Sequence, residues 1–280
     1  MKSFNRENNL ELILKKSSKR TIITHQYTAQ PLGISRSFYP DLTNPSRTHL
    51  YLTSTSPGLL ANDTLNIAVK LENKAQLCLK EQSATKVHPM PNLGTKATVN
   101  YDIEIGEKAT LEFFPEPIIL FRDATLEQII QITCHPTANL FWSEIIVPGR
   151  LARGEYYEFN YYLNRLHIRT VEGVLWAKDA MKLMGNQNQF KENNLFAFAP
   201  ILGNIILILP QGNLSLLVEI LEKFSLVDCP GVKIATSILP QNKGIVIRAI
   251  ARGTYGFKNY LNYSLKCFRQ AQSFCNEGML

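Results

Sequence analysis

The sequence predicts a mainly β protein with about two α-helices in its C-terminal part. From about residue 20 to residue 174, apolar and polar side chains alternate with period two, which places successive side chains on opposite faces of a sheet. Turn-forming residues interrupt these runs at intervals close to about 8–12 residues, a spacing typical of a sandwich, a barrel or a solenoid. The runs leave no room for helical crossovers, so a βαβ arrangement is not expected.

Individual strands are predicted from runs in which every second residue is apolar. The clearest runs are residues 49–53, 65–71, 76–80, 98–105 and 109–113. Asn73 and Gly106 lie between neighbouring runs, and Asn and Gly are residues that turns favour. Each run therefore predicts one strand.

Two later segments change to the helical period. Residues 214–226 place apolar side chains on one face, and Asn213 just before them is a suitable helix cap. Residues 257 to about 271 form a second apolar face, with basic side chains elsewhere on the helix. We expect both helices to pack on the sheet.

The chain is expected to form one domain. Its 280 residues are 45% hydrophobic, which suffices for a substantial core. No shift in composition, flexible linker or repeat divides it. The predicted organisation is a single domain over residues 1–280, with a β-rich part over 20–175 and an α/β portion over 176–280.

The net charge of +7 is concentrated at the two ends of the chain. Residues 1–25 carry six Lys and Arg against two acids, and residues 241–280 carry six against one, whereas the middle carries 18 against 20. Basic ends fit either an acidic partner or plain solvation. A nucleic-acid-binding protein is an alternative for so basic a chain, but no helix-turn-helix, finger or RNA-binding signature is present.

Cysteines and histidines give no sign of a disulfide framework or a structural zinc site. The five cysteines, at positions 78, 134, 229, 267 and 275, form no CxxC pair, and the five histidines are scattered. The N-terminus lacks the apolar stretch of a secretory signal, and the longest apolar run is about half the ~20 residues of a membrane span. Free thiols in the cytoplasm, no membrane partner and no tightly bound cofactor are therefore expected.

Four segments outside the regular runs carry candidate chemistry. In the loop 54–63, Pro57-Gly58 favours a type II turn, Asn62 tolerates the left-handed conformation, and Asp63 can cap neighbouring amides. His88 and Met90 offer two ligands for a soft metal, although without a third. Two prolines around Glu116 predict an edge or a crossover, where Glu116, Arg122 and Asp123 would form a buried network or a satisfied ion pair.

The fourth segment, residues 142–155, holds two carboxylates and two guanidinium groups. Paired carboxylates perform acid–base chemistry when burial separates their pKa values, so a carboxylate-dependent hydrolase is an alternative function. The alternative is that these two carboxylates and two guanidinium groups form ordinary salt bridges. The neighbouring Cys134 and His135 would point to opposite faces of a strand, which argues against a nucleophile–base dyad.

Taken together, several blocks of the chain resemble the urease accessory proteins called UreD or UreH. The matching blocks are PLGI (31–34) with SFYP (37–40), SPGLLAND (56–63), QSATKVH (82–88), LEFFPEPII (111–119), WSEII (142–146) and GRLARGE (149–155). Asn62 departs from the Gly that the family commonly has there, but Asn holds the same left-handed turn. The resemblance is weaker through residue 173 and returns at residues 247–249.

This resemblance implies a solenoid-like fold of stacked strands and a non-enzymatic role in urease maturation. Such a protein binds apo-urease, recruits a UreF-type helical partner and, through it, a UreG-type GTPase, and assists the delivery of Ni²⁺, which passes transiently through an internal passage. We place the carboxylates of Asp63, Glu144 and Glu155 on that passage. Oxygen ligands that hold a divalent ion weakly suit transit better than a closed thiolate cage.

Overall fold

The computed structural model describes residues 8–92, 94–185 and 198–277, and the side chains of residues 225–227 and 273–277 are outside the description. The strands are β1 (Leu10–Lys16), β2 (Thr21–Thr28), β3 (Leu32–Ile34), β4 (Thr48–Ser54), β5 (Thr64–Leu71), β6 (Gln76–Glu81), β7 (Thr85–Val87), β8 (Ala97–Ile105), β9 (Thr110–Phe114), β10 (Ile118–Leu120), β11 (Thr125–Cys134), β12 (Asn139–Val147), β13 (Tyr161–Thr170), β14 (Leu175–Met184), β15 (Ile201–Ile208), β16 (Val232–Ile238) and β17 (Gly244–Ala251). The helices are η1 (Leu151–Arg153), α2 (Leu214–Val227), η3 (Pro240–Asn242) and α3 (Thr254–Glu277).

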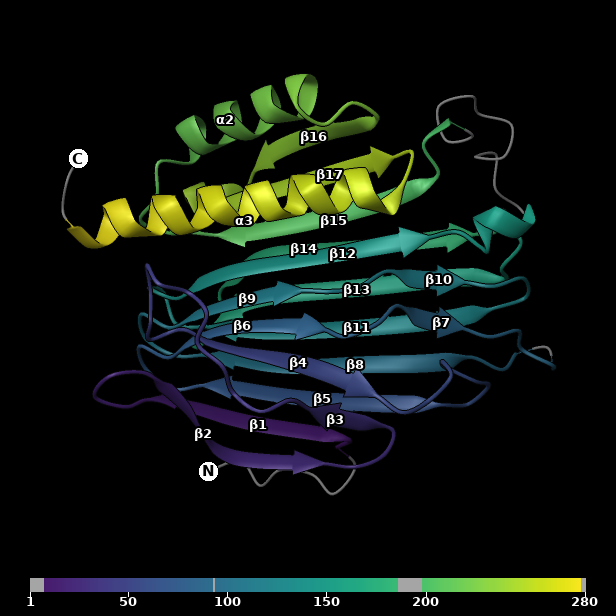
Figure 1. The fold of residues 1–280 in the computed structure, drawn as a ribbon, viewed down its shortest axis with the longest axis horizontal. Coiled ribbons are helices and arrows are strands. Elements are labelled where there is room, and N and C mark those ends of the chain that lie inside the picture. The colour runs from purple at the N-terminus through teal and green to yellow at the C-terminus, as the bar shows by residue number, and fades with distance from the viewer. Residues whose placement is uncertain (1–7, 93, 186–197, 278–280) are drawn as a thin grey trace.

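Two open sheets face each other across the core. Sheet A has the strand order β14-β13-β11-β8-β5-β1-β2, and sheet B has the order β16-β17-β15-β12-β9-β6-β4-β3, with β7 and β10 beside it. The N-terminal strands lie at the bottom of Figure 1 and the C-terminal elements at the top, and the strands between them follow the chain, except that β2 lies outside β1 and β16 outside β17. The mainly β prediction with two late helices is thereby confirmed.

From β4 to β13 the chain alternates between the two sheets. Apart from the short β7 and β10, each strand of sheet B is followed by one of sheet A, and neighbours within a sheet are parallel, as in β5–β8–β11–β13 and β6–β9–β12. A strand of the opposite sheet thus makes the crossover that a helix makes in a βαβ unit. The pairs β1–β2, β13–β14 and β12–β15 are antiparallel. A solenoid remains a prediction, because neither sheet closes on itself.

The main core fills the space between the sheets. Alternate residues of each strand point inward, as in Val99, Tyr101, Ile103 and Ile105 of β8, so the period-two pattern of the sequence corresponds to one buried and one outward face. The ring of Trp142 stacks on Phe113 within sheet B and meets Tyr101 of sheet A edge-on. These contacts fix how the two sheets face each other.

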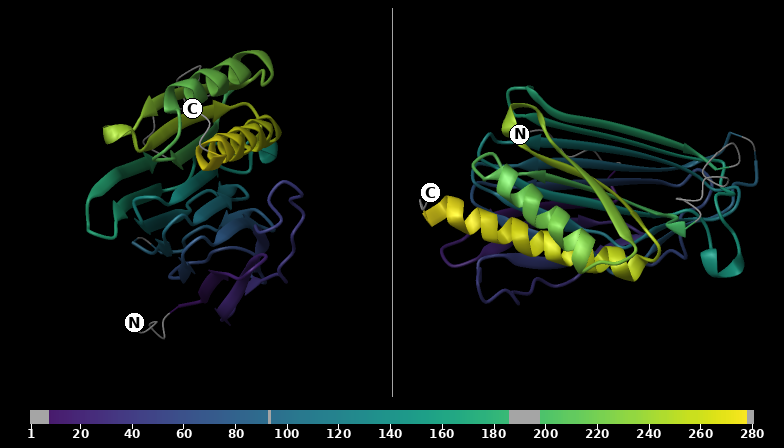
Figure 2. Two further views of the ribbon diagram at one scale, coloured as in Figure 1. Left: turned by 90° about the vertical axis from the view of Figure 1, so that its left-hand side faces the viewer. Right: turned by 90° about the horizontal axis from the view of Figure 1, so that it is seen from above.

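Both helices pack on the outer face of sheet B, which Figure 2 shows most clearly in its right-hand view. Helix α2 begins where predicted, because the Asn213 side chain accepts a hydrogen bond from the Leu216 amide. Helix α3 extends beyond the predicted 257–271 at both ends. Gly203 lets α3 approach the sheet, since an added Cβ there would lie 2.0 Å from the Phe257 ring.

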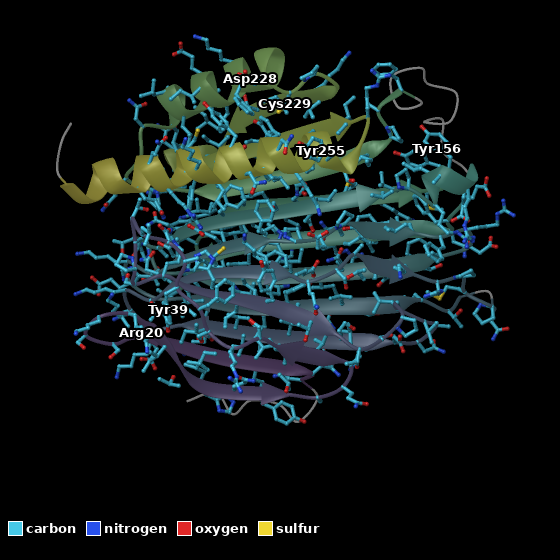
Figure 3. All side chains as sticks on the ribbon, in the orientation of Figure 1. Arg20, Tyr39, Tyr156, Asp228, Cys229 and Tyr255 are labelled. Carbon is cyan, nitrogen blue, oxygen red and sulfur yellow. The ribbon has the colours of Figure 1, made fainter. Side chains whose placement is uncertain are left out.

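A buried ion cluster holds the far part of α3 to sheet B. Arg269 of α3 donates two hydrogen bonds to Glu112 of β9, at 2.9 and 2.6 Å, and Glu112 is fully buried. Arg47 lies 3.2 Å from the same carboxylate and also pairs with Asp41. The loop that supplies Asp41 and Arg47 is anchored at Tyr39, whose hydroxyl bonds to the Thr21 carbonyl and whose ring lies beneath the Arg20 guanidinium (Figure 3).

The sequence analysis missed β1, because it placed the start of the period-two pattern at about residue 20, although Leu10, Leu12 and Leu14 already alternate. β1 pairs in parallel with β5 and antiparallel with β2, and its Leu10, Leu12 and Leu14 are fully buried. Among the described helices, none combines the length and apolar character that crossing a bilayer requires.

Buried cysteines should be unreactive in the folded protein. Cys78, Cys134, Cys229 and Cys267 are free and buried, whereas the side chain of Cys275 lies outside the described residues. Burial raises the pKa of Cys78 and of Cys134 to about 12, so at pH 8 their thiolate fraction is about a thousandfold below that of an ordinary cysteine. Mass-spectrometric mapping of a thiol reagent should find both unlabelled in the native protein and labelled in denaturant. Fast native labelling of either would contradict this.

Candidate functional site

A buried carboxylate lies between the two sheets. Glu144 of β12 points inward from sheet B and is 3% exposed. Both of its oxygens accept hydrogen bonds of 2.8 Å from the side-chain amide of Asn164, on β13 of sheet A, and one accepts a bond of 3.0 Å from Asn204 on β15. Burial raises the pKa of Glu144 to about 7, although the two amide hydrogen bonds favour the ionised form.

Glu144 belongs to a continuous polar layer, which we define as Gln128, Asn164, Glu144, Asn204 and Arg248. Within sheet A, Gln128 and Asn164 are cross-strand partners, and within sheet B, Glu144 pairs in register with Asn204 and Asn204 with Arg248. The hydrogen bond between Asn164 and Glu144 joins the two halves of the layer. At its end, Arg248 forms an ion pair with the inward-pointing Asp179 of β14.

Two carbonyl oxygens of this layer have no partner. The Oδ1 atoms of Asn164 and Asn204 are buried and accept no hydrogen bond in the described part of the chain, while their NH₂ groups donate to Glu144. A buried acceptor without a partner carries a free-energy cost that a donor or a cation would remove. The layer thus presents amide oxygens as well as a carboxylate to any guest between the sheets.

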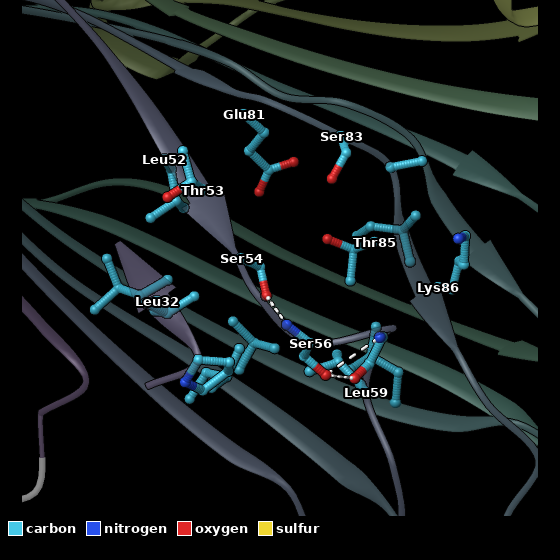
Figure 4. Close-up of a pocket in the computed structure, with 18 of the residues that line it drawn as sticks. Leu32, Leu52, Thr53, Ser54, Ser56, Leu59, Glu81, Ser83, Thr85 and Lys86 are labelled. Atoms are coloured by element: carbon cyan, nitrogen blue, oxygen red, sulfur yellow. Dashed lines mark hydrogen bonds between the residues drawn. The ribbon is translucent and has the colours of Figure 1, made fainter. Parts of the chain in front are cut away.

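One end of the polar layer reaches a cavity of about 210 Å³ between the sheets. Its walls come from β4, β6 and β7 on one side and from β5, β8 and β11 on the other, and Gln128 is among the lining residues. Figure 4 shows the Glu81 carboxylate pointing into this space, with Ser54 and Thr85 nearby. Burial, together with the charge of Glu116, raises the pKa of Glu81 to about 7 against the opposing hydrogen bond from the Glu116 amide. The cavity therefore has a second carboxyl group that titrates near neutrality.

The other end of the polar layer reaches a groove of about 490 Å³ at the open edge between the sheets. Asn204 and Arg248 lie on its floor, and its walls are mostly apolar, with Met181 and Leu183 of β14 on one side and Ile234 and Ile250 of sheet B on the other. The polar layer thus connects a cavity to a groove through the interior of the molecule.

Asp63 is part of a turn just before β5. Its carboxylate accepts a 2.7 Å hydrogen bond from the Leu60 amide, and Asn62 beside it has φ of 67°. The capping role of Asp63 and the left-handed conformation of Asn62, both predicted from the loop sequence, are confirmed. The Asp63 carbonyl also accepts from the Thr98 amide, which joins the turn to β8.

Glu155 closes the loop that connects β12 to β13. Its carboxylate accepts hydrogen bonds from the Arg150 guanidinium, at 2.9 and 2.5 Å, and from the Arg122 amide at 2.7 Å. Burial disfavours its charge, but these donors outweigh burial and lower the pKa of Glu155. Gly149, with φ of 137°, permits the close approach of this loop, because a Cβ there would lie 2.4 Å from the Glu155 carbonyl oxygen.

The three predicted site carboxylates lie toward the same end of the sheets. Asp63 precedes β5, Glu155 precedes β13, and Glu144 is three residues before the end of β12, whose C-terminal end is joined to the start of β13 by the loop that holds Glu155. No hydrogen bond or ion pair given for the described residues joins any two of them. The described part of the chain also contains no group of three His, Cys, Asp or Glu side chains arranged to hold a metal.

The remaining candidate residues have separate partners. Of the two alternatives for Glu116, Arg122 and Asp123, the buried network is wrong and ion pairing is confirmed, with partners outside this group: Glu116 pairs with Lys258 of α3 and Arg122 with Glu158. The proline-rich segment contains only the short β10, beside the main path of sheet B. His88 lies 3.3 Å from the Pro57 carbonyl oxygen, and Met90 is buried.

Sequence reasoning missed Glu81, Asn164 and Asn204. Each occupies the inward phase of its strand: Glu81 follows Leu77 and Leu79 at alternate positions, and Asn164 lies between Tyr162 and Leu166. A polar residue in the buried phase of a strand is the signal that would have identified them. Asn204 interrupts the longest apolar run of the chain, residues 201–209, which is too short for a membrane span and instead contains β15.

Comparison with known proteins agrees with the motif blocks. The family model described as UreD urease accessory protein matches residues 6–277. A urease accessory protein UreD of Trichodesmium erythraeum is 48% identical over 263 residues, which cover 94% of this chain and 94% of that protein. UreD proteins of Lysinibacillus sphaericus and Cenarchaeum symbiosum are 30% and 27% identical over 72% and 88% of this chain and over 74% and 85% of their own lengths. The chain belongs to the UreD family of urease accessory proteins.

Proposed function

We propose that this protein is a non-enzymatic maturation factor that helps deliver Ni²⁺ into the active site of urease. It would act in the cytoplasm as a scaffold that binds apo-urease and a UreF-type accessory protein, and through the latter a UreG-type GTPase. Family membership supports the link to urease maturation. The nickel role rests on the polar layer.

The observation that carries the nickel role is the position of Glu144 between a cavity and a groove. The polar layer joins these two spaces through one carboxylate and two amide oxygens that accept no hydrogen bond from any residue the structure describes. Oxygen ligands hold a borderline cation such as Ni²⁺ less firmly than thiolates do, which suits release. Because the pKa of Glu144 is about 7, an arriving divalent ion would displace a proton at little cost, and the returning proton would favour release of the ion.

Asp63 and Glu155 are proposed as passage residues at the rim, with Glu144 inside. Their present partners are backbone amides and the Arg150 guanidinium, so each would have to exchange a partner to contact the ion. Glu81, which points into the cavity, is a fourth candidate that the structure adds. The polar path would then run from the rim through the cavity to Glu144.

The proposal predicts that urease activation depends on this chain. Cells that carry the urease subunits and all other accessory genes should produce urease of low nickel content and low activity when this gene is deleted. Restoring the gene should restore both, and the chain should co-purify with apo-urease. Full nickel content in the deletion strain would contradict the proposal.

A further inference from the structure

Sheet A has an outer face that no helix of the described residues covers. Both α2 and α3 pack on sheet B, on the opposite side of the molecule, as the right-hand view of Figure 2 shows. On β13 and β14, the outward positions alternate with buried ones such as Leu166 and Leu183. This leaves a two-stranded, solvent-exposed surface at the edge of sheet A.

Basic side chains occupy most of the outward positions on these two strands. We define the cationic face as Arg165, His167, Arg169, Lys178 and Lys182. Cross-strand register places His167 beside Lys178 and Leu163 beside Lys182. Four of the five are exposed and His167 is half-buried. Opposed strands lie about 4.8 Å apart, so these groups form a compact positive surface.

The neighbouring acids offset the cationic face only in part. Glu127 on β11 bonds to Lys96 and to the Tyr161 hydroxyl, and the charge of Arg165 is a further cause that lowers its pKa. Glu104 on β8 is paired with Lys70 and lines the same groove as Arg169. Asp102 lies two strands from His167, about 10 Å away, and Asp179 points inward to Arg248. None of the five groups of the cationic face takes part in an ion pair with another described residue.

We propose that the cationic face binds an acidic surface of apo-urease, an inference that rests on the proposed function. Because the five basic groups outnumber the acids beside them, the face keeps an excess of positive charge, which attracts an acidic partner over about one Debye length, near 8–10 Å in physiological salt. The exposed apolar residues Val171, Val174 and Leu175 at one end of the face fit a protein partner, because a duplex nucleic acid presents phosphates that apolar side chains do not bind.

A transient partner fits this surface better than a permanent one. Permanent interfaces bury large apolar areas, whereas exposed charges accelerate association and hold a complex weakly. Urease is the partner that a maturation factor must release. β14 also forms one wall of the groove at the end of the polar layer, so binding to its outer face would bring urease to the mouth of that groove.

The test uses two charge-reversal variants, Lys178→Glu/Lys182→Glu on β14 and Arg165→Glu/Arg169→Glu on β13. The control, Lys19→Glu/Lys223→Glu, makes the same change in net charge at exposed positions outside the cationic face. Binding of each full-length protein to purified apo-urease would be measured by interferometry at about 50 and about 300 mM NaCl. Circular dichroism and thermal unfolding check the fold of each variant.

We expect wild type and control to bind at low salt and to weaken at high salt, and each reversal variant to lose at least about tenfold in affinity at low salt. Equal binding by folded reversal variants and wild type would overturn this inference. If wild type does not bind apo-urease at either salt concentration, the proposed function fails instead. Binding of duplex DNA that the reversals abolish, with apo-urease binding retained, would identify a nucleic-acid surface and overturn the inference as well.

Discussion

Replacing Glu144 by Gln should lower urease activation about tenfold without unfolding the protein. Gln keeps the size of Glu and one acceptor oxygen, replaces the other oxygen by an NH₂ donor, and removes the negative charge that would hold a divalent ion between Asn164 and Asn204. A tenfold effect corresponds to a loss of about 1.4 kcal/mol of ion stabilisation along the route. The measurement is the nickel content and specific activity of urease matured in cells that carry the variant.

Glu104→Gln is the matched control. It removes the same charge from the outer face of sheet A, where Glu104 pairs with Lys70 at the surface. Activation should stay at the wild-type level. Both variants should co-purify with apo-urease, because neither changes the cationic face. Full activation by Glu144→Gln would remove Glu144 from the nickel route.

Glu144→Gln should also raise the conformational stability of the protein at alkaline pH. In the folded protein the pKa of Glu144 is about 7, above its ordinary value of 4.5, so between these values the folded state binds more protons than the unfolded state. Stability therefore falls as pH rises from about 4.5 through 7, and Gln removes that loss. At pH 8 we expect Glu144→Gln to be more stable than wild type by on the order of 2 kcal/mol in urea unfolding. If Glu144→Gln is more stable than wild type but activates urease less, the Glu144 carboxylate serves function rather than stability.

The period of the apolar residues was enough to predict a mainly β chain and the two helices, and the residue types at a helix start and a turn predicted the roles of Asn213 and Asp63. Each of these depends on local sequence, since alternation decides which side chains of a strand are buried and a cap needs one side chain near one turn. The pairing of strands could not be predicted in this way. β5 and β8 are neighbours in sheet A although β6 and β7, on the other side, separate them in the chain.

Of the candidate site, the sequence identified Glu144 but not its environment. Its partners Asn164 and Asn204 come from strands 20 and 60 residues further along the chain, in different sheets. No motif spacing encodes such a contact, because it depends on how the two sheets face each other. Glu155 shows both kinds of contact. Its bond to Arg150 lies within one motif block, whereas its bond to the Arg122 amide depends on the fold and could not be predicted from the sequence.

The largest effect on stability is expected from Glu112→Gln. Glu112 is fully buried, and its carboxylate neutralises Arg269 of α3 and Arg47 of the loop before β4. Gln would leave the buried Arg47 and the partly exposed Arg269 with Asp41 as their remaining acid, at 3.6 Å from Arg269. Removing one partner of a buried ion pair costs about 3–5 kcal/mol, a large fraction of the about 5–15 kcal/mol that stabilises a typical domain.

Urea unfolding of the purified chain measures this loss, and the surface variant Glu104→Gln should change stability by less than about 1 kcal/mol. Adding Arg269→Met should recover part of the loss, because an apolar side chain of similar length removes one unpaired charge. Cys78 is the register partner of Glu112 on β6, beneath the same part of α3. Faster labelling of Cys78 in Glu112→Gln below the unfolding transition would show that α3 separates from sheet B before the sheets unfold. Wild-type stability in Glu112→Gln would mean that the cluster is not what holds α3 in place.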